Sequence, residues 1–94
     1  MSITAVPGFE AAGVASGVKS SGDADLALVA TADRRPAAAA GVFTTNIVRA
    51  APVLVSRAHL QGGQAVAVIL NSGNANAATG EHGRANARRM CELV

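Results

Sequence analysis

The sequence contains few aromatic residues and carries little net charge. None of its 94 residues is Trp or Tyr, two are Phe, and the net charge at neutral pH is only +2. Nucleic-acid binding normally needs a clustered basic face, and single strands are usually held by aromatic stacking platforms. These absences argue against a nucleic-acid partner.

Cysteine and histidine are also scarce. Cys91 is the only cysteine, so the chain forms no internal disulfide and no zinc site of its own. It falls among apolar neighbours on a predicted helix, where we expect a small packed core residue in a reduced compartment. His59 and His82 have no metal-ligand pattern around them, and we expect structural or solvated roles for both. The sequence predicts no metal and no cofactor.

Long hydrophobic runs and targeting signals are missing as well. The longest bulky apolar run, residues 65–70, is far shorter than the roughly 20 residues of a membrane-spanning helix. The first ten residues lack the basic and apolar regions of a signal peptide. We therefore expect a cytoplasmic protein with no membrane partner.

Alanine dominates what is present. It supplies 22 of the 47 apolar residues, whereas Ile, Leu, Val and Phe together supply only 22 of all 94 residues. A domain of this size buries only about 60–65 % of its unfolded surface, and alanine adds little side chain to that burial. The helices and strands must therefore pack closely together or pack against elements outside this sequence. This favours an incomplete domain or an obligate subunit.

The spacing of apolar residues predicts an α/β chain with about five short strands, one short helical turn and one C-terminal helix. Residues 65–70 are typical of a strand buried on both faces, and Pro52 suggests an edge or a bulge in its strand. Residues 37–44 are ambiguous, because four alanines favour a helix whereas Gly41 and the β-formers after it favour a strand; we expect a strand. The expected elements are strands at 9–18, 26–31, 37–44, 48–56 and 65–70, a helical turn at 57–61 and a helix at 81–94.

The expected C-terminal helix carries an apolar stripe at helical spacing. Its members are Gly83, Ala87, Met90, Cys91 and Val94. No glycine, proline or polar tail provides a stop signal after the stripe. We interpret residues 1–94 as a single incomplete domain whose last helix continues in a longer chain.

The segment that carries most information is the strand, loop and helix over residues 65–94. Loops at the carboxyl end of a buried strand are where α/β proteins bind ligands, and a helix N-terminus offers free N–H groups. We take Asn71, Gly73 and Asn74 of the loop at 71–80 as candidate substrate-binding residues. The alternative is that the asparagines hydrogen-bond the loop to itself and to nearby backbone. The sequence has no nucleotide-binding glycine motif, and its hydroxyls have no visible base to activate them.

Several segments resemble a known enzyme family. They are GFEAAGVASGVK (8–19), DLALV (25–29), AAAAGVFTTN (37–46), AAPVLVSRAHL (50–60) and AVAVILNSGNANAATG (65–80). The most specific piece is NSGNANA followed by TG. In this order, and over almost the whole sequence, they are similar to the amino-terminal part of the glutamate N-acetyltransferase family of arginine biosynthesis, whose members are also called ornithine acetyltransferases.

The resemblance implies a layered α/β fold like that of DmpA and ornithine acetyltransferase, of which these residues form only the N-terminal portion. Members of this family cut themselves before a threonine into an α chain and a β chain, which the resemblance suggests assemble as an α2β2 heterotetramer. The new N-terminal threonine takes the acetyl group of N2-acetylornithine, with its own α-amine as base, and passes the group to glutamate. Some members also use acetyl-CoA as a substrate. The implied partners are these small molecules, the remainder of the α chain, and the β chain.

The family's catalytic residues have no counterpart in this sequence. The cleavage motif is Ala-Thr-Met, and neither Ala30-Thr31 nor Ala78-Thr79 is followed by Met. Thr79-Gly80 belongs to the NSGNANA segment and does not match the later Thr-Gly pair of the family's oxyanion hole. We therefore expect no activity from this chain alone. The alternatives that we keep are a small anion-binding module and a non-catalytic structural subunit, each using residues 71–80 and the helix at 81–94.

Overall fold

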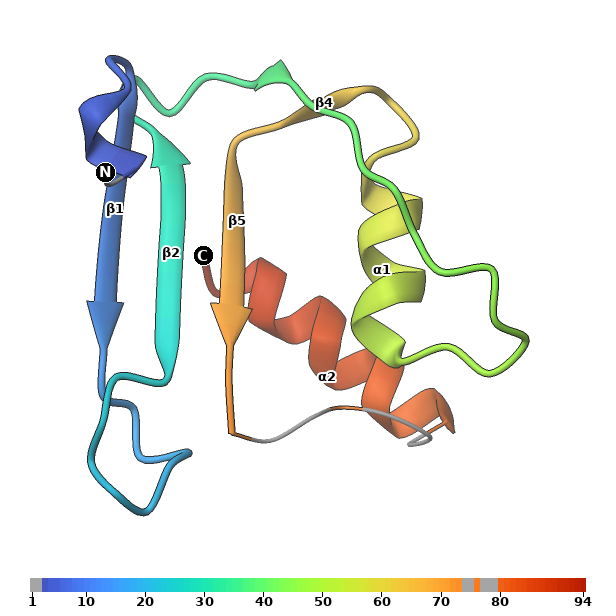
Figure 1. Ribbon diagram of the computed structural model, residues 1–94. Helices are drawn as coiled ribbons and strands as arrows, with labels where there is room; N and C mark the ends of the chain where they lie inside the picture. Colours follow the sequence, from blue (N-terminus) through green and yellow to red (C-terminus); the bar gives the residue numbers. More distant parts are fainter. Residues whose placement is uncertain (1–2, 74–75, 77–79) are drawn as a thin grey trace. The chain divides into compact units, whose positions relative to one another are not determined.

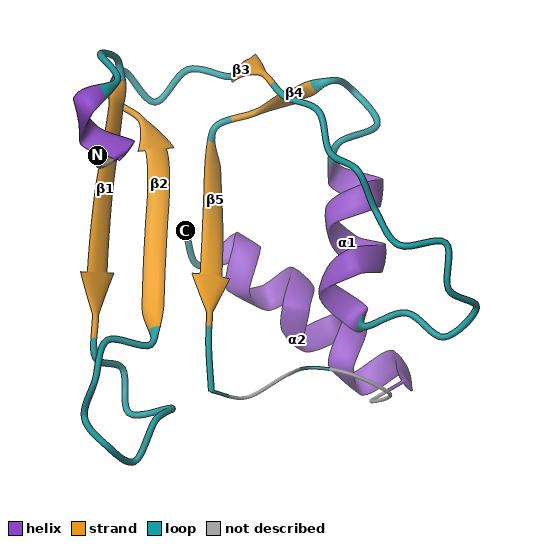
Figure 2. Cartoon of the chain, viewed as in Figure 1, coloured by secondary structure: helices purple, strands orange, loops and turns teal. Residues whose placement is uncertain are grey.

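The structure, a computed structural model, describes residues 3–73, 76 and 80–94 (Figure 1). The chain divides into two compact units, residues 1–37 with 66–74 and residues 38–65 with 75–94. Strands dominate the first unit and helices the second (Figure 2). This content confirms the expected α/β class. No helix in the described ranges is long and apolar enough to cross a membrane.

The first unit is built on an antiparallel sheet. Its strands are β1 (Phe9–Val14), β2 (Leu26–Thr31) and β5 (Ala67–Asn71). The order is β1-β2-β5, so β2 is the central strand, and its arrow in Figure 1 runs opposite to the other two. At one end of the sheet Leu26 lies opposite Val14 in β1 and Asn71 in β5. A short 3-10 helix, η1 (Ile3–Ala5), precedes β1.

The link between β1 and β2 explains why the first strand is shorter than expected. Pairing ends at Val14 instead of continuing to Val18. The N–H of Ser16 donates to the carboxylate of Asp25 and not to a neighbouring strand. Gly17 then takes a φ of +94°, which is outside the extended region and is easily adopted only by glycine. The second strand has the expected bounds.

Two helices pack together in the second unit. They are α1 (Ala51–His59) and α2 (Gly80–Glu92). The buried cluster between them consists of Ala51, Val55 and Ala87. Two of these three side chains are single methyl groups, so the helix backbones can approach closely. The last helix starts and ends within two residues of its expected bounds.

The expected strand at 48–56 is wrong, because the helix α1 covers residues 51–56; the helical turn expected at 57–61 is the end of that helix, which runs to His59. Pro52 lies in the first turn of this helix, where a missing N–H leaves no hydrogen bond unmade and a fixed φ favours the helix. Ala51 and Val55 are the two buried residues of the helix and have the i, i+4 spacing of one face. The proline therefore marks a helix start and not a strand edge.

The expected strand at 37–44 shrinks to two residues. β3 (Ala37–Ala38) pairs with β4 (Gln64–Ala65). Beyond this pair Gly41 lies close under the ring of Phe43, since a Cβ on Gly41 would stand 2.9 Å from the ring Cζ. The ring therefore lies on the side of the chain where Gly41 has no side chain, and residues 39–44 do not belong to a strand.

Two expectations about burial are also wrong. β5 is not buried on both faces, since Val68 and Leu70 are 54 % and 50 % exposed while Ala67 and Ile69 are half-buried. This alternation is typical of an antiparallel strand with one covered face. Cys91 is exposed, because the buried face of α2 consists of Gly83 and Ala87 and ends before it.

Candidate functional site

Two of the candidate substrate-binding residues lie at the end of β5. Asn71 is the last residue of that strand and Gly73 follows two positions later, and both are exposed. Between them the N–H of Ser72 donates to the main-chain carbonyl of Asp25 at 2.9 Å. The structure thus brings Asn71 and Gly73 to one end of the sheet, beside Asp25. Asn74, the third candidate, lies outside the described residues.

Asp25 organises this end of the sheet. Asp25 is only 3 % exposed. Its carboxylate accepts hydrogen bonds from the Ser16 hydroxyl, from the Lys19 N–H at 3.0 Å and from the Ser16 N–H at 2.7 Å. The Ser16 hydroxyl first, and then the two N–H groups, hold the pKa of Asp25 far below its ordinary value. An anion that is so fully hydrogen-bonded fixes the β1–β2 link and is not available as a proton acceptor.

Gly73 is required by close packing against that link. Its φ is +93°, and a Cβ on it would stand 2.7 Å from Cγ of Lys19 and 3.5 Å from Cγ1 of Val18. Glycine adopts this φ without steric cost and has no side chain to collide with the lysine. Gly73 therefore lets the chain after β5 lie against the Lys19 side chain.

Asn76 shows where one asparagine of the loop makes its hydrogen bonds. Its Nδ2 donates to the carbonyl of Gly83 at 2.7 Å, and its own carbonyl accepts the N–H of Ala51 at 3.1 Å. The residue thus joins the first turn of α2 to the first residue of α1. For Asn76 the structure favours the alternative interpretation, in which the loop asparagines hold neighbouring backbone.

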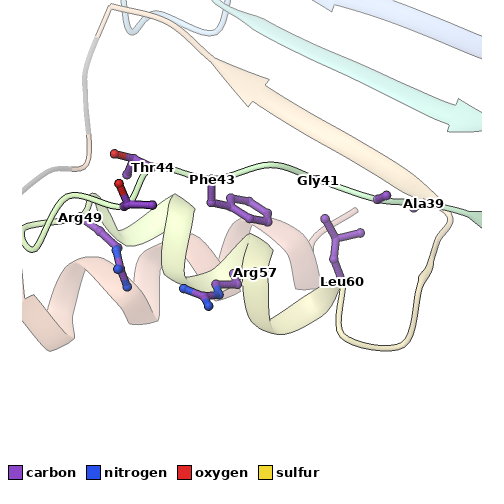
Figure 3. A pocket seen from close by; sticks show the side chains of 9 residues that line it. Ala39, Gly41, Phe43, Thr44, Arg49, Arg57 and Leu60 are labelled. Carbon is purple, nitrogen blue, oxygen red and sulfur yellow. The ribbon is translucent and has the colours of Figure 1, made fainter.

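A polar cavity of about 580 Å³ lies wholly in the second unit, between α1 and residues 39–49 (Figure 3). It is lined by the polar residues Thr44, Thr45, Arg49 and Arg57 and by the apolar residues Phe43 and Leu60, among others. We call it the arginine pocket. The Nε atom of Arg49 is buried and has no hydrogen-bond partner in the described part of the chain. Arginine side chains gathered in this way can bind an oxyanion.

Sequence reasoning missed the arginine pocket, although a signal for it exists. Residues 34–80 contain no Asp or Glu, yet they contain four arginines. Arginines without acidic neighbours in the sequence are candidates for binding an external anion. The fold adds what the sequence lacks, because it places residues 39–49 against α1. A smaller cavity of about 280 Å³ also includes Arg49, together with Arg84, which is paired with Glu81.

The histidines take no part in these sites. His59 is the last residue of α1 and His82 lies in the first turn of α2, and both are exposed. Among the described residues no group of three His, Cys, Asp or Glu side chains could hold a metal ion.

Fold and sequence together define the class of protein: a mixed α/β chain in which an asparagine- and glycine-rich loop joins a strand to a helix. The ArgJ family profile matches residues 10–94, and the chain belongs to the ArgJ family. This is the family that the resemblance in the sequence indicated.

Individual relatives agree with this assignment. The arginine biosynthesis bifunctional protein ArgJ of Gloeobacter violaceus is 57 % identical over 82 residues, which are 86 % of this chain and 20 % of that protein. The protein of the same name from Streptomyces avermitilis is 53 % identical over 94 residues, which are 100 % of this chain and 24 % of that protein. The chain thus spans about a fifth to a quarter of the length of these curated relatives.

Solved structures share the fold. Ornithine acetyltransferase from Mycobacterium tuberculosis, in complex with ornithine, matches with a TM-score of 0.87 and 55 % identity over 93 % of this chain and 45 % of that chain. The arginine biosynthesis bifunctional protein from Bacillus halodurans matches with a TM-score of 0.90 and 38 % identity over 99 % of this chain and 48 % of that chain. The layered fold expected from the resemblance is therefore confirmed.

Proposed function

We propose that the full-length protein carrying this chain moves an acetyl group from N2-acetylornithine to glutamate in the cyclic pathway of arginine biosynthesis. The observation that carries this proposal is the match to the ArgJ family over residues 10–94. Identities of 53–57 % to proteins named for arginine biosynthesis support it. So does the likeness to an acetyltransferase solved with ornithine.

The proposed chemistry is a two-step acyl transfer through an acetyl-threonine. The hydroxyl of an N-terminal threonine, created by self-cleavage, attacks the acetyl carbonyl while its α-amine accepts the hydroxyl proton. The C–N bond to ornithine breaks, the proton passes to the leaving amine, and the acetyl group stays on the threonine oxygen. The amine of glutamate then attacks this ester and releases the threonine. Hydrogen-bond donors of an oxyanion hole stabilise each tetrahedral intermediate.

Both the nucleophile and the oxyanion hole lie outside these 94 residues in our proposal, so this chain alone is inactive. Its part is to supply the β1-β2-β5 sheet and the α1–α2 pair, with Asn71, Gly73 and Asn74 helping to shape the substrate site. The other partners are the remainder of the α chain and the β chain, in an α2β2 heterotetramer in the cytoplasm. Acetyl-CoA is a second acetyl donor that this proposal allows.

The decisive experiment uses the full-length protein and an isotopically labelled acetyl group. Labelled N2-acetylornithine and glutamate are incubated with the protein, and products are identified by mass spectrometry. We expect label in N-acetylglutamate and an equal amount of free ornithine. Omitting glutamate should leave one acetyl mass on the threonine-bearing peptide. If the full-length protein moves no label, the proposed function is wrong. Labelled acetyl-CoA in a parallel reaction tests the second donor.

Two further measurements test what this chain contributes. The 94-residue chain should give no transfer and should unfold gradually, so that a sharp two-state transition would contradict its expected dependence on the rest of the protein. Replacing Asn71 by Ala in the full-length protein should raise the KM for N2-acetylornithine. Asn46→Ala, in the exposed loop before α1, is the matched control and should leave KM unchanged. Equal KM values for the two variants would remove Asn71 from the substrate site.

A further inference from the structure

The arginine pocket gathers positive charge that has no negative partner within it. Arg49 comes from the segment before α1 and Arg57 from the last turns of that helix. In Figure 3 their guanidinium ends lie on the same side of Phe43. None of the residues lining the pocket is acidic. Two like charges facing the same cavity repel each other unless an anion lies between them.

The charge pattern of the sequence sharpens this point. Every salt bridge found within the described residues joins a glutamate to Arg34, Arg84, Arg88 or Arg89. Arg49 and Arg57 have no such bridge in the described part of the chain, and residues 34–80 offer them no acidic neighbour. Among the described residues the exposed Arg35 also lacks a salt bridge, but it does not line a cavity; Arg49 and Arg57 differ from it because both line the arginine pocket.

One atom of the pocket is already desolvated. Nε of Arg49 is buried without a partner among the described residues. A buried donor on a charged group costs free energy when it is left unpaired, and only an oxyanion that approaches Nε itself would remove that cost. Arginine presents its donors in a planar fork that fits carboxylate and phosphate oxygens. Thr44 and Thr45 also line the cavity, but the hydroxyl oxygen of Thr44 accepts the N–H of Asn46 and points away from the two guanidinium ends in Figure 3.

The other end of the pocket is apolar. Phe43 and Leu60 line it, and Gly41 lets them close together, since a Cβ there would stand 3.0 Å from Cδ1 of Leu60. A cavity of about 580 Å³ is of the size that holds small organic ligands. An inorganic ion would use the arginines and leave the Phe43 end unfilled. The lining as a whole is suited to a molecule with an anionic head and a short apolar part.

We propose that the arginine pocket is a binding site for a small organic oxyanion. Its carboxylate or phosphate head binds between Arg49 and Arg57, and its apolar part packs against Phe43 and Leu60. The proposal concerns binding alone and stands independently of acetyl transfer.

The test is equilibrium binding to the full-length protein, measured by calorimetry with hexanoate and with inorganic phosphate as probes. Hexanoate carries one carboxylate and an apolar tail, whereas phosphate has a head only. We expect saturable binding that weakens about tenfold or more in Arg57→Ala, since a charge-assisted hydrogen bond is lost. Arg57 is exposed, so this variant should fold. Arg49→Lys keeps the charge but removes the Nε donor, and it should also weaken binding.

Two control variants separate the pocket from general electrostatics and identify the head group. Arg34→Ala removes an exposed arginine of the first unit that is paired with Glu10, and it should leave both affinities unchanged. Phe43→Ala should weaken hexanoate and not phosphate if the ligand is an organic carboxylate. Tighter binding of phosphate, unaffected by Phe43→Ala, would assign the pocket to phosphate-bearing ligands. If neither probe binds, or if Arg57→Ala binds both as the unmodified protein does, the proposal is wrong.

Discussion

Replacing Asn76 by Ala tests the hydrogen bond that joins the asparagine-rich loop to α2. The amide of Asn76 donates to the carbonyl of Gly83 at 2.7 Å, and Gly83 is one of the two buried residues of that helix. The second bond of this residue, from the N–H of Ala51 to its carbonyl, uses the backbone and survives the substitution. The change therefore isolates the side-chain contribution to the α1–α2 contact.

The expected cost is that of one net hydrogen bond, about 1 kcal/mol. It is not larger, because the Gly83 carbonyl lies inside a helix and keeps its helical partner. Asn76→Asp should cost more than Asn76→Ala, because a carboxylate cannot donate to the carbonyl and faces its oxygen instead. The predicted order of destabilisation is Asn76→Asp, then Asn76→Ala, then Asn46→Ala, whose exposed side chain makes the last change close to neutral.

Hydrogen exchange followed by mass spectrometry on the full-length protein measures this locally. A loss of about 1 kcal/mol in opening free energy accelerates exchange about fivefold. We expect that acceleration in peptides covering residues 51–59 and 80–92, and none in the β1-β2-β5 sheet. Unchanged exchange in Asn76→Ala, or an equal effect of Asn46→Ala, would refute the assignment of Asn76 as the link between the helices.

Three further predictions concern the free energy of unfolding of the full-length protein. Val55→Ala removes two methyl groups at a position 6 % exposed and should cost about 2 kcal/mol. Gly73→Ala forces a side chain into a φ of +93° and should cost about 1–3 kcal/mol. Asp25 has a lowered pKa in the folded state. Its carboxylate therefore stabilises the folded protein fully above the unfolded pKa of about 3.9, and this contribution is lost as the pH falls through the folded pKa. Asp25→Asn should reduce the dependence of the free energy of unfolding on pH in the acid range.

Each of these predictions has its own control and its own contrary result. Val42→Ala changes a fully exposed valine and should stay within about 0.5 kcal/mol; equal effects at Val42 and Val55 would mean that the buried cluster contributes little. Gly62→Ala is the control for Gly73→Ala, because a Cβ on Gly62 meets open space. Equal changes in the free energy of unfolding would mean that the backbone of Gly73 imposes no special cost. For Asp25, urea denaturation between pH 6 and acid pH is compared with the asparagine variant. Identical pH profiles would show that the carboxylate does not couple folding to protonation.

The sequence predicted β2 and α2 well because both have unambiguous local patterns. The run at 26–31 is short and apolar, and the stripe through Gly83 and Ala87 has helical spacing. α1 was mistaken for a strand because residues 48–56 alternate and contain Pro52. The same proline at a helix start is favourable, and only the packing of Val55 against α2 decides between the two readings. Local patterns thus fail where tertiary contacts select the helix.

The candidate site could be predicted only in part, for a similar reason. Composition pointed to the 71–80 loop, and the structure places Asn71 and Gly73 at the end of β5. The composition of the sequence did not reveal the role of Asp25. An aspartate in an Asp-rich turn looks ordinary until the structure shows its carboxylate accepting three hydrogen bonds. Nor did the composition reveal the arginine pocket, because Arg49 and Arg57 converge only when residues 39–49 lie against α1.

The β1-β2-β5 sheet explains why function must be tested in the full-length protein. An antiparallel sheet with one solvated face alternates apolar and polar residues, yet β2 is LALVAT and β5 is AVILN. Both faces of the sheet are therefore apolar: Val68 pairs with Val29 on one, and Ile69 with Leu28 on the other. One of these faces is exposed in this chain, and the relatives that share the fold have chains about twice as long in solved structures. We therefore expect the rest of the full-length protein to cover the exposed apolar face, and activity to be measurable only when it does.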